Sequence, residues 1–175
     1  DQSGWLPVRK ADYPMDNLTG QYAPPVLLLK RLAPARVFVS PAGETIIDAG
    51  QVVAGNVQFS LTAPAGRTIT LEHSEVLDEE GNFFNNILGT NKEQTVTYIT
   101  KEGFQTYRPT FSYHGFRYIR VTGWPGRLSP NDFVIYTYTS GMDDIGGFTT
   151  SDRRLNRLQQ NIWWSQAANT ISIPT

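Results

Sequence analysis

The sequence predicts a mainly β protein, in which an antiparallel β-sandwich follows an extended connector and precedes a single α-helix. Three observations support this fold class. Four Trp, eight Tyr and nine Phe residues accompany many Thr, Val and Ile residues, which are the types that favour strands. Apolar and polar residues alternate in several short segments, as in half-buried strands. Clusters of Pro, Gly and Asn separate these segments, as turns separate the strands of a sandwich.

Residues 1–35 are predicted to form an extended connector or the tail of a preceding domain. This range has few periodic apolar positions and contains Pro7, Pro14, Pro24, Pro25 and Pro34. Proline lacks the backbone donor that a regular helix or an inner strand needs, so extended backbone is expected. The chain begins with Asp1 rather than Met, and we expect it to be a processed or excised piece of a longer protein.

Residues 36–147 are predicted to form the β-sandwich. In the segment VQFSLT, Val57, Phe59 and Leu61 lie on one face of a strand and the polar residues lie on the other. Further strand candidates occupy residues 36–40, 44–50, 67–73, 94–100, 116–123 and 132–139. Turn residues separate the candidates at 41–43, 64–66, 80–82 and 124–126. Strands at this short spacing indicate a sandwich of antiparallel strands.

Residues 148–175 are predicted to contain one helix of about five turns. Ser151 is the expected N-cap, and Leu155, Leu158 and Ile162 follow at helical spacing. The sequence offers no second helix to pack against it. We therefore expect a linker helix that leads to a further domain absent from this chain.

Composition and charge exclude several classes of function. The chain has 15 Lys plus Arg and 16 Asp plus Glu, a net charge of -1, so neither nucleic acid nor a membrane is an expected partner. The absence of cysteine excludes disulfides and thiolate zinc sites. With only His73 and His114 as histidines, neither a nucleophilic triad nor a histidine zinc site can be built from the sequence.

The densest acidic cluster allows three interpretations. It consists of Glu72, Glu75, Asp78, Glu79 and Glu80. Paired carboxylates perform glycoside hydrolysis, but an exposed hairpin is the favoured interpretation because the cluster adjoins the turn residues Gly-Asn. Calcium is the third, with Asp78, Glu80 and Asn82 as weak candidate ligands, although the sequence pattern of an EF-hand loop is absent.

Sugar binding is a further hypothesis, because an aromatic face can stack on the C–H face of a pyranose. The candidate carbohydrate-binding residues are Trp124, Tyr113, His114, Asn85, Asn86 and Asn91. The alternative for Trp124 is a packing role in the core. The alternative for His114 is a ring that bridges two segments by hydrogen bonds, while Gly115 supplies a backbone conformation that a side chain forbids.

Four segments resemble the bacterial α-L-rhamnosidases of glycoside hydrolase family 78. They are DAGQVVAGNVQFSL (48–61), PAGRTITLEHSEVLDEEGNFF (64–84), YRPTFSYHGFRYIRVTG (107–123) and GGFTTSDRRLNRLQQNIWWSQAANTISIPT (146–175). The H-G-F-R-Y and E-V-L-D-x-x-G blocks carry most of the resemblance. It implies a concanavalin-like, or jelly-roll, β-sandwich.

The resemblance also implies a catalytic partner outside this chain. In the family, an (α/α)6 barrel hydrolyses terminal α-L-rhamnose by inversion with two carboxylates, and the motif that carries the general acid follows Pro174-Thr175. No catalytic residue is therefore expected here. The sequence departs from the family at Leu88, where arginine is usual, and at Val96, where an acidic residue is usual. The family's role implies an exported protein, periplasmic or extracellular in a bacterium.

We weigh three hypotheses of function. The first is a non-catalytic β-sandwich domain that supports the catalytic barrel of an α-L-rhamnosidase-like glycoside hydrolase. The second is an autonomous carbohydrate-binding module for rhamnose-containing glycans. The third is a protein-interaction sandwich that docks through the apolar face of the helix at Leu155 to Ile162. No cofactor is expected to be required, although bound calcium is compatible with the loops.

Overall fold

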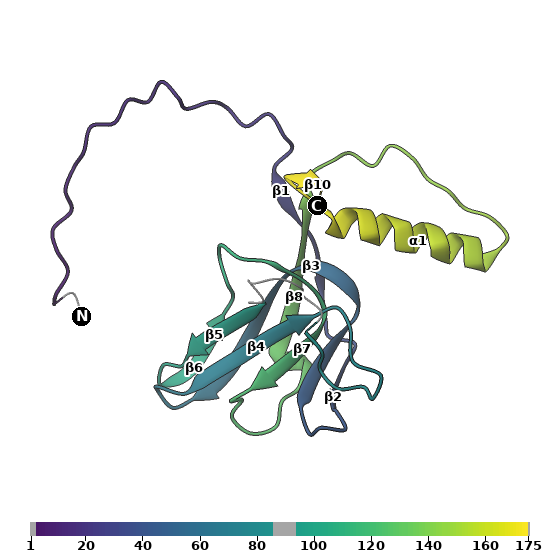
Figure 1. The fold of residues 1–175 in the computed structure, drawn as a ribbon, viewed down its shortest axis with the longest axis horizontal. Coiled ribbons are helices and arrows are strands. Elements are labelled where there is room, and N and C mark those ends of the chain that lie inside the picture. Colours follow the sequence, from purple (N-terminus) through teal and green to yellow (C-terminus); the bar gives the residue numbers. More distant parts are fainter. Residues whose placement is uncertain (1–2, 86–93, 175) are drawn as a thin grey trace.

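The computed structural model describes residues 3–85 and 94–174 and confirms a mainly antiparallel β fold with one C-terminal helix (Figure 1). The strands are β1 (Val26–Leu32), β2 (Arg36–Val39), β3 (Thr45–Ala63), β4 (Thr68–Ser74), β5 (Thr95–Ile99), β6 (Gly103–Tyr107), β7 (His114–Thr122), β8 (Phe133–Ser140), β9 (Thr170–Ile171) and β10 (Ile173–Pro174). The helices are a 3-10 turn, η1 (Pro130–Asp132), and α1 (Arg153–Ala168).

The long strand β3 joins the two layers of the sandwich. Its first part pairs with β2 and β7, and its last part pairs with β8 and β6. The register with β7 shifts between Asp48 and Val53, and such an irregularity bends a strand and increases its twist. The remaining pairs complete the order β1-β8-β3-β7-β4-β5. One continuous sheet therefore curls over and encloses its own core.

The core lies between these layers, and Phe59 on β3 is central to it. Its ring lies 5.5 Å from that of Tyr98 on β5, 5.8 Å from that of Trp124 and 6.3 Å from that of Phe133 on β8, measured between centroids. The alternating residues Val57, Phe59 and Leu61 are all buried, as their spacing predicts. Each buried aromatic side chain removes a large apolar area from water, which is the main stabilising term of such a fold.

The structure adds four strands to the predicted ones, β1, β6 and the short pair β9 and β10, and it merges two predicted strands into one. Strand β1 lies inside the range 1–35 that the sequence assigns to a connector, and it pairs antiparallel with β8. Strand β6 was not predicted, and the candidates at 44–50 and 57–62 are parts of the single strand β3. Strand β1 is an edge strand that is exposed along most of its length. No buried face therefore imposes an alternation of apolar and polar residues on it.

Residues 3–25 form no strand or helix and run away from the sandwich as an exposed arm (Figure 1). At the other end of the chain, α1 lies beside the sandwich and not within it (Figure 1). The N-cap of α1 is Asp152, whose carboxylate accepts a hydrogen bond from the backbone N–H of Arg154, so the prediction of Ser151 was wrong. No helix in the described part of the chain is long and apolar enough to cross a membrane.

Candidate functional site

One arginine holds two carboxylates, Glu72 of the acidic cluster and Glu44. Arg120 on β7 donates two hydrogen bonds to the Glu72 carboxylate, both 2.7 Å, and a third, 2.6 Å long, to Glu44. Glu44 also accepts hydrogen bonds from the Phe83 backbone and the Ser40 hydroxyl. Burial acts to raise the pKa of Glu44, but these hydrogen bonds and the Arg120 charge outweigh it and lower that pKa.

Asp48 is also held by arginines, and unlike Glu44 and Glu72 it is buried. Its side chain is 4% exposed and accepts hydrogen bonds of 2.9 and 3.3 Å from Arg117, one of 3.3 Å from Arg36, and one from the backbone of Gly50. Burial acts to raise the pKa of Asp48, but the hydrogen bond and charge of Arg117 outweigh it and lower that pKa. An acid that must donate a proton needs a raised pKa. Asp48 and Glu44 are therefore held as anions by arginines from neighbouring segments of the chain.

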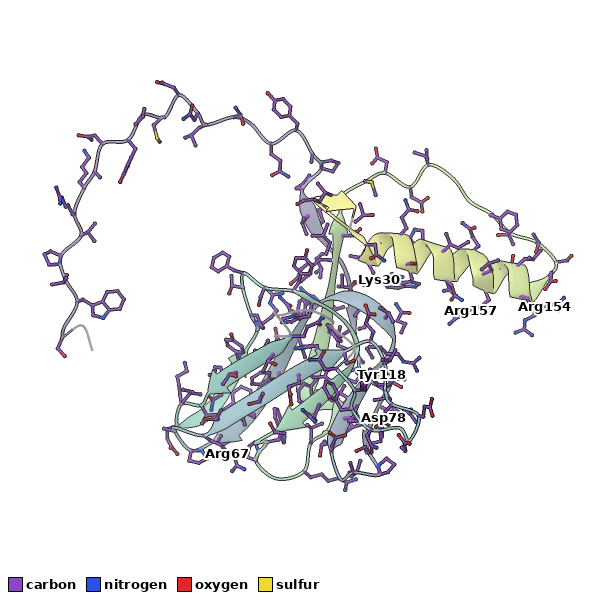
Figure 2. All side chains as sticks on the ribbon, viewed as in Figure 1. Lys30, Arg67, Asp78, Tyr118, Arg154 and Arg157 are labelled. Carbon is purple, nitrogen blue, oxygen red and sulfur yellow. The ribbon has the colours of Figure 1, made fainter. Side chains whose placement is uncertain are left out.

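The three weak calcium candidates are the residues of a tight turn, at the Asp78 loop labelled in Figure 2. Both Asp78 carboxylate oxygens accept hydrogen bonds from Asn82, and the Asn82 side-chain oxygen accepts one from the backbone of Ala42. These hydrogen bonds engage the side-chain oxygens of Asp78 and Asn82 with which a hard cation would bind. Within residues 3–85 and 94–174, no three His, Cys, Asp or Glu side chains gather as a metal site. Calcium binding stays a prediction.

The two histidines lie together inside the sandwich. Their rings stack with centroids 4.5 Å apart and an interplanar angle of 22°. His73 is 2% exposed, and its Nδ1 lies 2.8 Å from the backbone oxygen of Gln94. Burial, and then the neighbouring His114, lower the pKa of His73 to about 3, against the opposing effect of that hydrogen bond. Burial also lowers the pKa of His114. The pair is therefore neutral at physiological pH.

His114 does not have the predicted bridging role. Its Nε2 is buried and has no hydrogen-bond partner in the part of the chain that the structure describes. Gly115 lies in β7 opposite Ala54 and has no positive φ, so the prediction of a special backbone conformation there was wrong. Stacking on His73 holds the ring of His114 instead. The sequence gives no sign of this contact beyond the presence of two histidines.

The candidate sugar-binding aromatics Tyr113 and Trp124 lie at opposite ends of β7. A strand of nine residues separates them, which corresponds to about 27 Å. The ring of Trp124 lies 4.8 Å from that of Phe133 in the core, so one side of the indole is covered. The structure therefore does not bring these two residues into one site.

Tyr113 lines an open hollow of about 530 Å³ with the fully exposed Phe111. Asn56 and Tyr138 also line it, and they are engaged with each other through a 3.1 Å hydrogen bond. Of the predicted asparagines, Asn85 lies at the end of the segment after β4, whereas Asn86 and Asn91 lie outside the described residues, as does Leu88. Val96 packs against the core.

The helix α1 turns its predicted apolar face away from the sheet. Trp164 packs against the core, and Ala167 is buried. Leu155, Leu158 and Ile162 lie about half a turn away around the helix, and 46–54% of each is exposed. We call these three residues the apolar stripe. Sequence periodicity located the stripe, and of the two indoles, one of which was expected to face the sandwich, Trp164 is the one that packs against the core.

Comparisons with known proteins identify what this fold is similar to. Residues 39–138 match the family model described as the bacterial alpha-L-rhamnosidase concanavalin-like domain. An alpha-L-rhamnosidase of Streptomyces avermitilis is 35% identical over 177 residues, which cover 100% of this chain and 17% of the relative. The chain therefore spans about a fifth of the length of such relatives.

Solved structures agree with the sequence match. Native α-L-rhamnosidase of Aspergillus terreus superposes with a TM-score of 0.89 at 32% identity, over 100% of this chain and 20% of the other. The Streptomyces avermitilis α-L-rhamnosidase, solved in complex with L-rhamnose, gives a TM-score of 0.86 at 34% identity, over 100% of this chain and 17% of the other. The concanavalin-like β-sandwich that the resemblance implied is confirmed.

Proposed function

Because the chain belongs to the bacterial α-L-rhamnosidase family through its concanavalin-like domain, we propose that it is a non-catalytic β-sandwich domain. It supports the catalytic part of an α-L-rhamnosidase-like glycoside hydrolase that acts on terminal α-L-rhamnose. The proposed partner is an (α/α)6 catalytic domain of the same protein, and the proposed location is outside the cytoplasm of a bacterium.

The apolar stripe of α1 is the observation that carries this proposal. Three large apolar side chains in a row on the outer face of a helix are costly to leave in water. The relatives are about five to six times as long as this chain, so they contain ample further structure to cover such a stripe. Asp48 and Glu44 are paired with arginines that lower their pKa values, which suits a scaffold better than acid catalysis.

The absence of catalysis is tested with an aryl α-L-rhamnoside. The purified chain is expected to release no product above the rate without protein. Turnover that rises in proportion to the chain and persists through repeated purification would contradict the non-catalytic role. A cooperative thermal melt of the same sample shows that the protein was folded during the assay.

The supporting role is tested in a chimera in which this chain replaces the matching segment of the Streptomyces avermitilis enzyme. Leu158→Asp with Ile162→Asp is expected to lower the chimera's activity and melting temperature, because both charges would be buried under the neighbouring domain. Phe104→Asp is the matched control, since Phe104 on β6 is 74% exposed. Equal effects of the stripe and control variants would contradict docking through α1.

A second candidate function is an autonomous module for rhamnose-containing glycans, favoured by the hollow beside Phe111 and Tyr113. Titration calorimetry with L-rhamnose, with calcium and then with a chelator, distinguishes the two. Saturable heat that Tyr113→Ala abolishes supports the module. If a folded sample gives no heat of binding, the result contradicts the autonomous module and favours the supporting role.

A further inference from the structure

A hollow of about 710 Å³ lies between the end of β1, the loop at Gly146 to Phe148 and one side of α1. Its position differs from that of the apolar stripe, because it opens beside the indoles of α1 and not on the outer face of the helix. Figure 2 shows its residues Lys30 and Arg157 at the end of the molecule that carries α1, away from Asp78 and Arg67.

The charge of this hollow is entirely positive. Lys30, Arg153 and Arg157 line it, and none of its lining residues is Asp or Glu. None of these three side chains has a carboxylate within ion-pair distance among residues 3–85 and 94–174, whereas Arg36, Arg117 and Arg120 of the sandwich all do. In a chain of net charge -1, this is a local concentration of unneutralised cations that attracts an anion.

The walls of the hollow are held in place by the fold. The register of β1 with β8 shifts between Leu28 and Lys30, and such a bulge changes the direction of the side chains beside it. The backbone of Lys30 is then fixed by two hydrogen bonds with the Thr137 hydroxyl, 3.0 and 3.1 Å. On the helix side, Asn156 exchanges two 2.8 Å hydrogen bonds with the backbone of Thr150 and so fixes the loop that precedes α1.

Aromatic rings complete the lining. Trp163 and Trp164 meet edge to face with centroids 5.1 Å apart, and the Lys30 ammonium lies 5.8 and 5.3 Å from the two ring centroids. Phe148 is 54% exposed at the rim. An aromatic surface suits the C–H face of a pyranose, and arginine forms paired hydrogen bonds with a carboxylate.

We propose that this hollow is a binding site for an anionic sugar residue, one whose carboxylate contacts Arg153 and Arg157 while its ring lies against the indoles. The site is separate from the hollow beside Tyr113 and does not depend on the supporting role, since the same chain can perform both. It adds recognition of an acidic glycan to a domain whose relatives are described only as α-L-rhamnosidases.

The test is calorimetric titration of the 175-residue chain with tri-galacturonate, and with maltotriose as the neutral trisaccharide. Saturable binding of tri-galacturonate that weakens at high salt is expected, with no binding of maltotriose. Arg157→Gln and Arg153→Gln are each expected to weaken binding about tenfold, the loss of a charge-assisted hydrogen bond. Trp163→Ala is expected to weaken it as well, and Trp163→Phe less so.

Arg127→Gln is the matched control, because it makes the same change at an exposed position in the turn after Trp124. It is expected to leave the affinity unchanged. Absence of saturable binding, equal binding of maltotriose, or equal loss in the control and hollow variants would each overturn the proposal. Thermal melts of all variants show that they are folded, and Arg153→Gln in the exposed first turn provides the test if Arg157→Gln is unstable.

Discussion

His73 and His114 show how burial sets the chemistry of single side chains in this domain. Their rings stack inside the sandwich, and His73 also meets the ring of Phe116 at 4.8 Å. A charged imidazole in this apolar environment loses its hydration, so the neutral form is favoured. The buried Asp48 and the partly buried Glu44 have lowered pKa values instead, because arginines accompany them. Partner geometry, and not burial alone, decides which buried groups carry charge.

The histidine pair predicts a pH dependence of stability. The folded-state pKa of His73 is about 3 against an ordinary value of 6.5, so the unfolded chain binds this proton more tightly. The stabilisation from neutral His73 is complete above pH 6.5 and is lost as pH falls below it, with a slope of up to about 1.4 kcal/mol per pH unit. Urea unfolding between about pH 7.5 and pH 5, above the range where most carboxylates titrate, measures it.

A His73→Gln variant separates this effect from other titrations. It removes the group that titrates, so the free energy of unfolding should depend less on pH across the same range. The variant is expected to be less stable at neutral pH, because the ring contacts are lost. An unchanged slope in the variant would contradict the assignment to His73.

Arg120 predicts a second effect at the residue scale. Arg120→Met leaves Glu44 and Glu72 unpaired on a surface that is only partly exposed, at 18% and 27% of their side chains. We expect a loss of about 2 kcal/mol in the free energy of unfolding, discounted for solvent screening. Arg154→Met is the control, because the side chain of Arg154 is 92% exposed beside Asp152, and we expect no measurable loss. Chemical denaturation of both variants makes the comparison.

At the element scale, two glycines in the turn that follows β7 differ in how closely they approach a neighbouring strand. Gly123 follows β7 with φ of 75°, and a Cβ there would lie 2.0 Å from the backbone oxygen of Thr68. Gly126 has the same φ of 75°, but nothing lies within 4 Å of its Cβ position. Gly126 requires glycine for its left-handed backbone alone. Gly123 requires it for the same backbone conformation and also for the close approach to Thr68.

This pair of glycines gives a matched prediction. Gly126→Ala is expected to cost about 1 kcal/mol, the cost of a left-handed backbone conformation for alanine. Gly123→Ala is expected to cost about 1–3 kcal/mol more, because the added methyl group collides with a strand of the sheet. Thermal or chemical denaturation of the two variants measures the difference. Equal losses would show that the close approach to Thr68 is absent in solution.

At the scale of the whole molecule, the described chain consists of a curled β-sandwich with two appended parts. The arm of residues 3–25 makes no strand or helix, and Trp5, Leu6, Val8 and Tyr22 on it are more than 80% exposed. The helix α1 contacts the sandwich through only part of its surface. The sandwich holds the buried core, and the appended parts present apolar side chains outward.

Limited proteolysis tests this organisation. Trypsin is expected to cleave first after Arg9 and Lys10 in the exposed arm, because extended and unpaired backbone enters a protease site readily. Cleavage after Lys30 or Arg31 in β1 should be slower, since that strand pairs with β8. The product that lacks the arm should melt at the same temperature as the whole chain. Early loss of β1, measured by mass spectrometry, would contradict this order.

The sequence by itself determined the fold class and most strands, because side-chain alternation and turn residues act over a few neighbouring positions. Val57, Phe59 and Leu61 were assigned to the core on that ground alone, and the apolar stripe of α1 was located by its helical spacing. The resemblance of four segments led to the correct family. Candidate sugar and calcium ligands were chosen by residue type, and their functions stay predictions.

Only the tertiary structure decided which distant residues meet. Strand β1 forms because β8 offers it an edge, the arginines of β7 find their carboxylates on β3 and β4, and Tyr113 and Trp124 are separated by the length of β7. The hollow that joins Lys30 to Arg157 brings together residues more than a hundred positions apart. Local patterns carry no information on such contacts, because strand order and bulges set them and both depend on the whole folded chain.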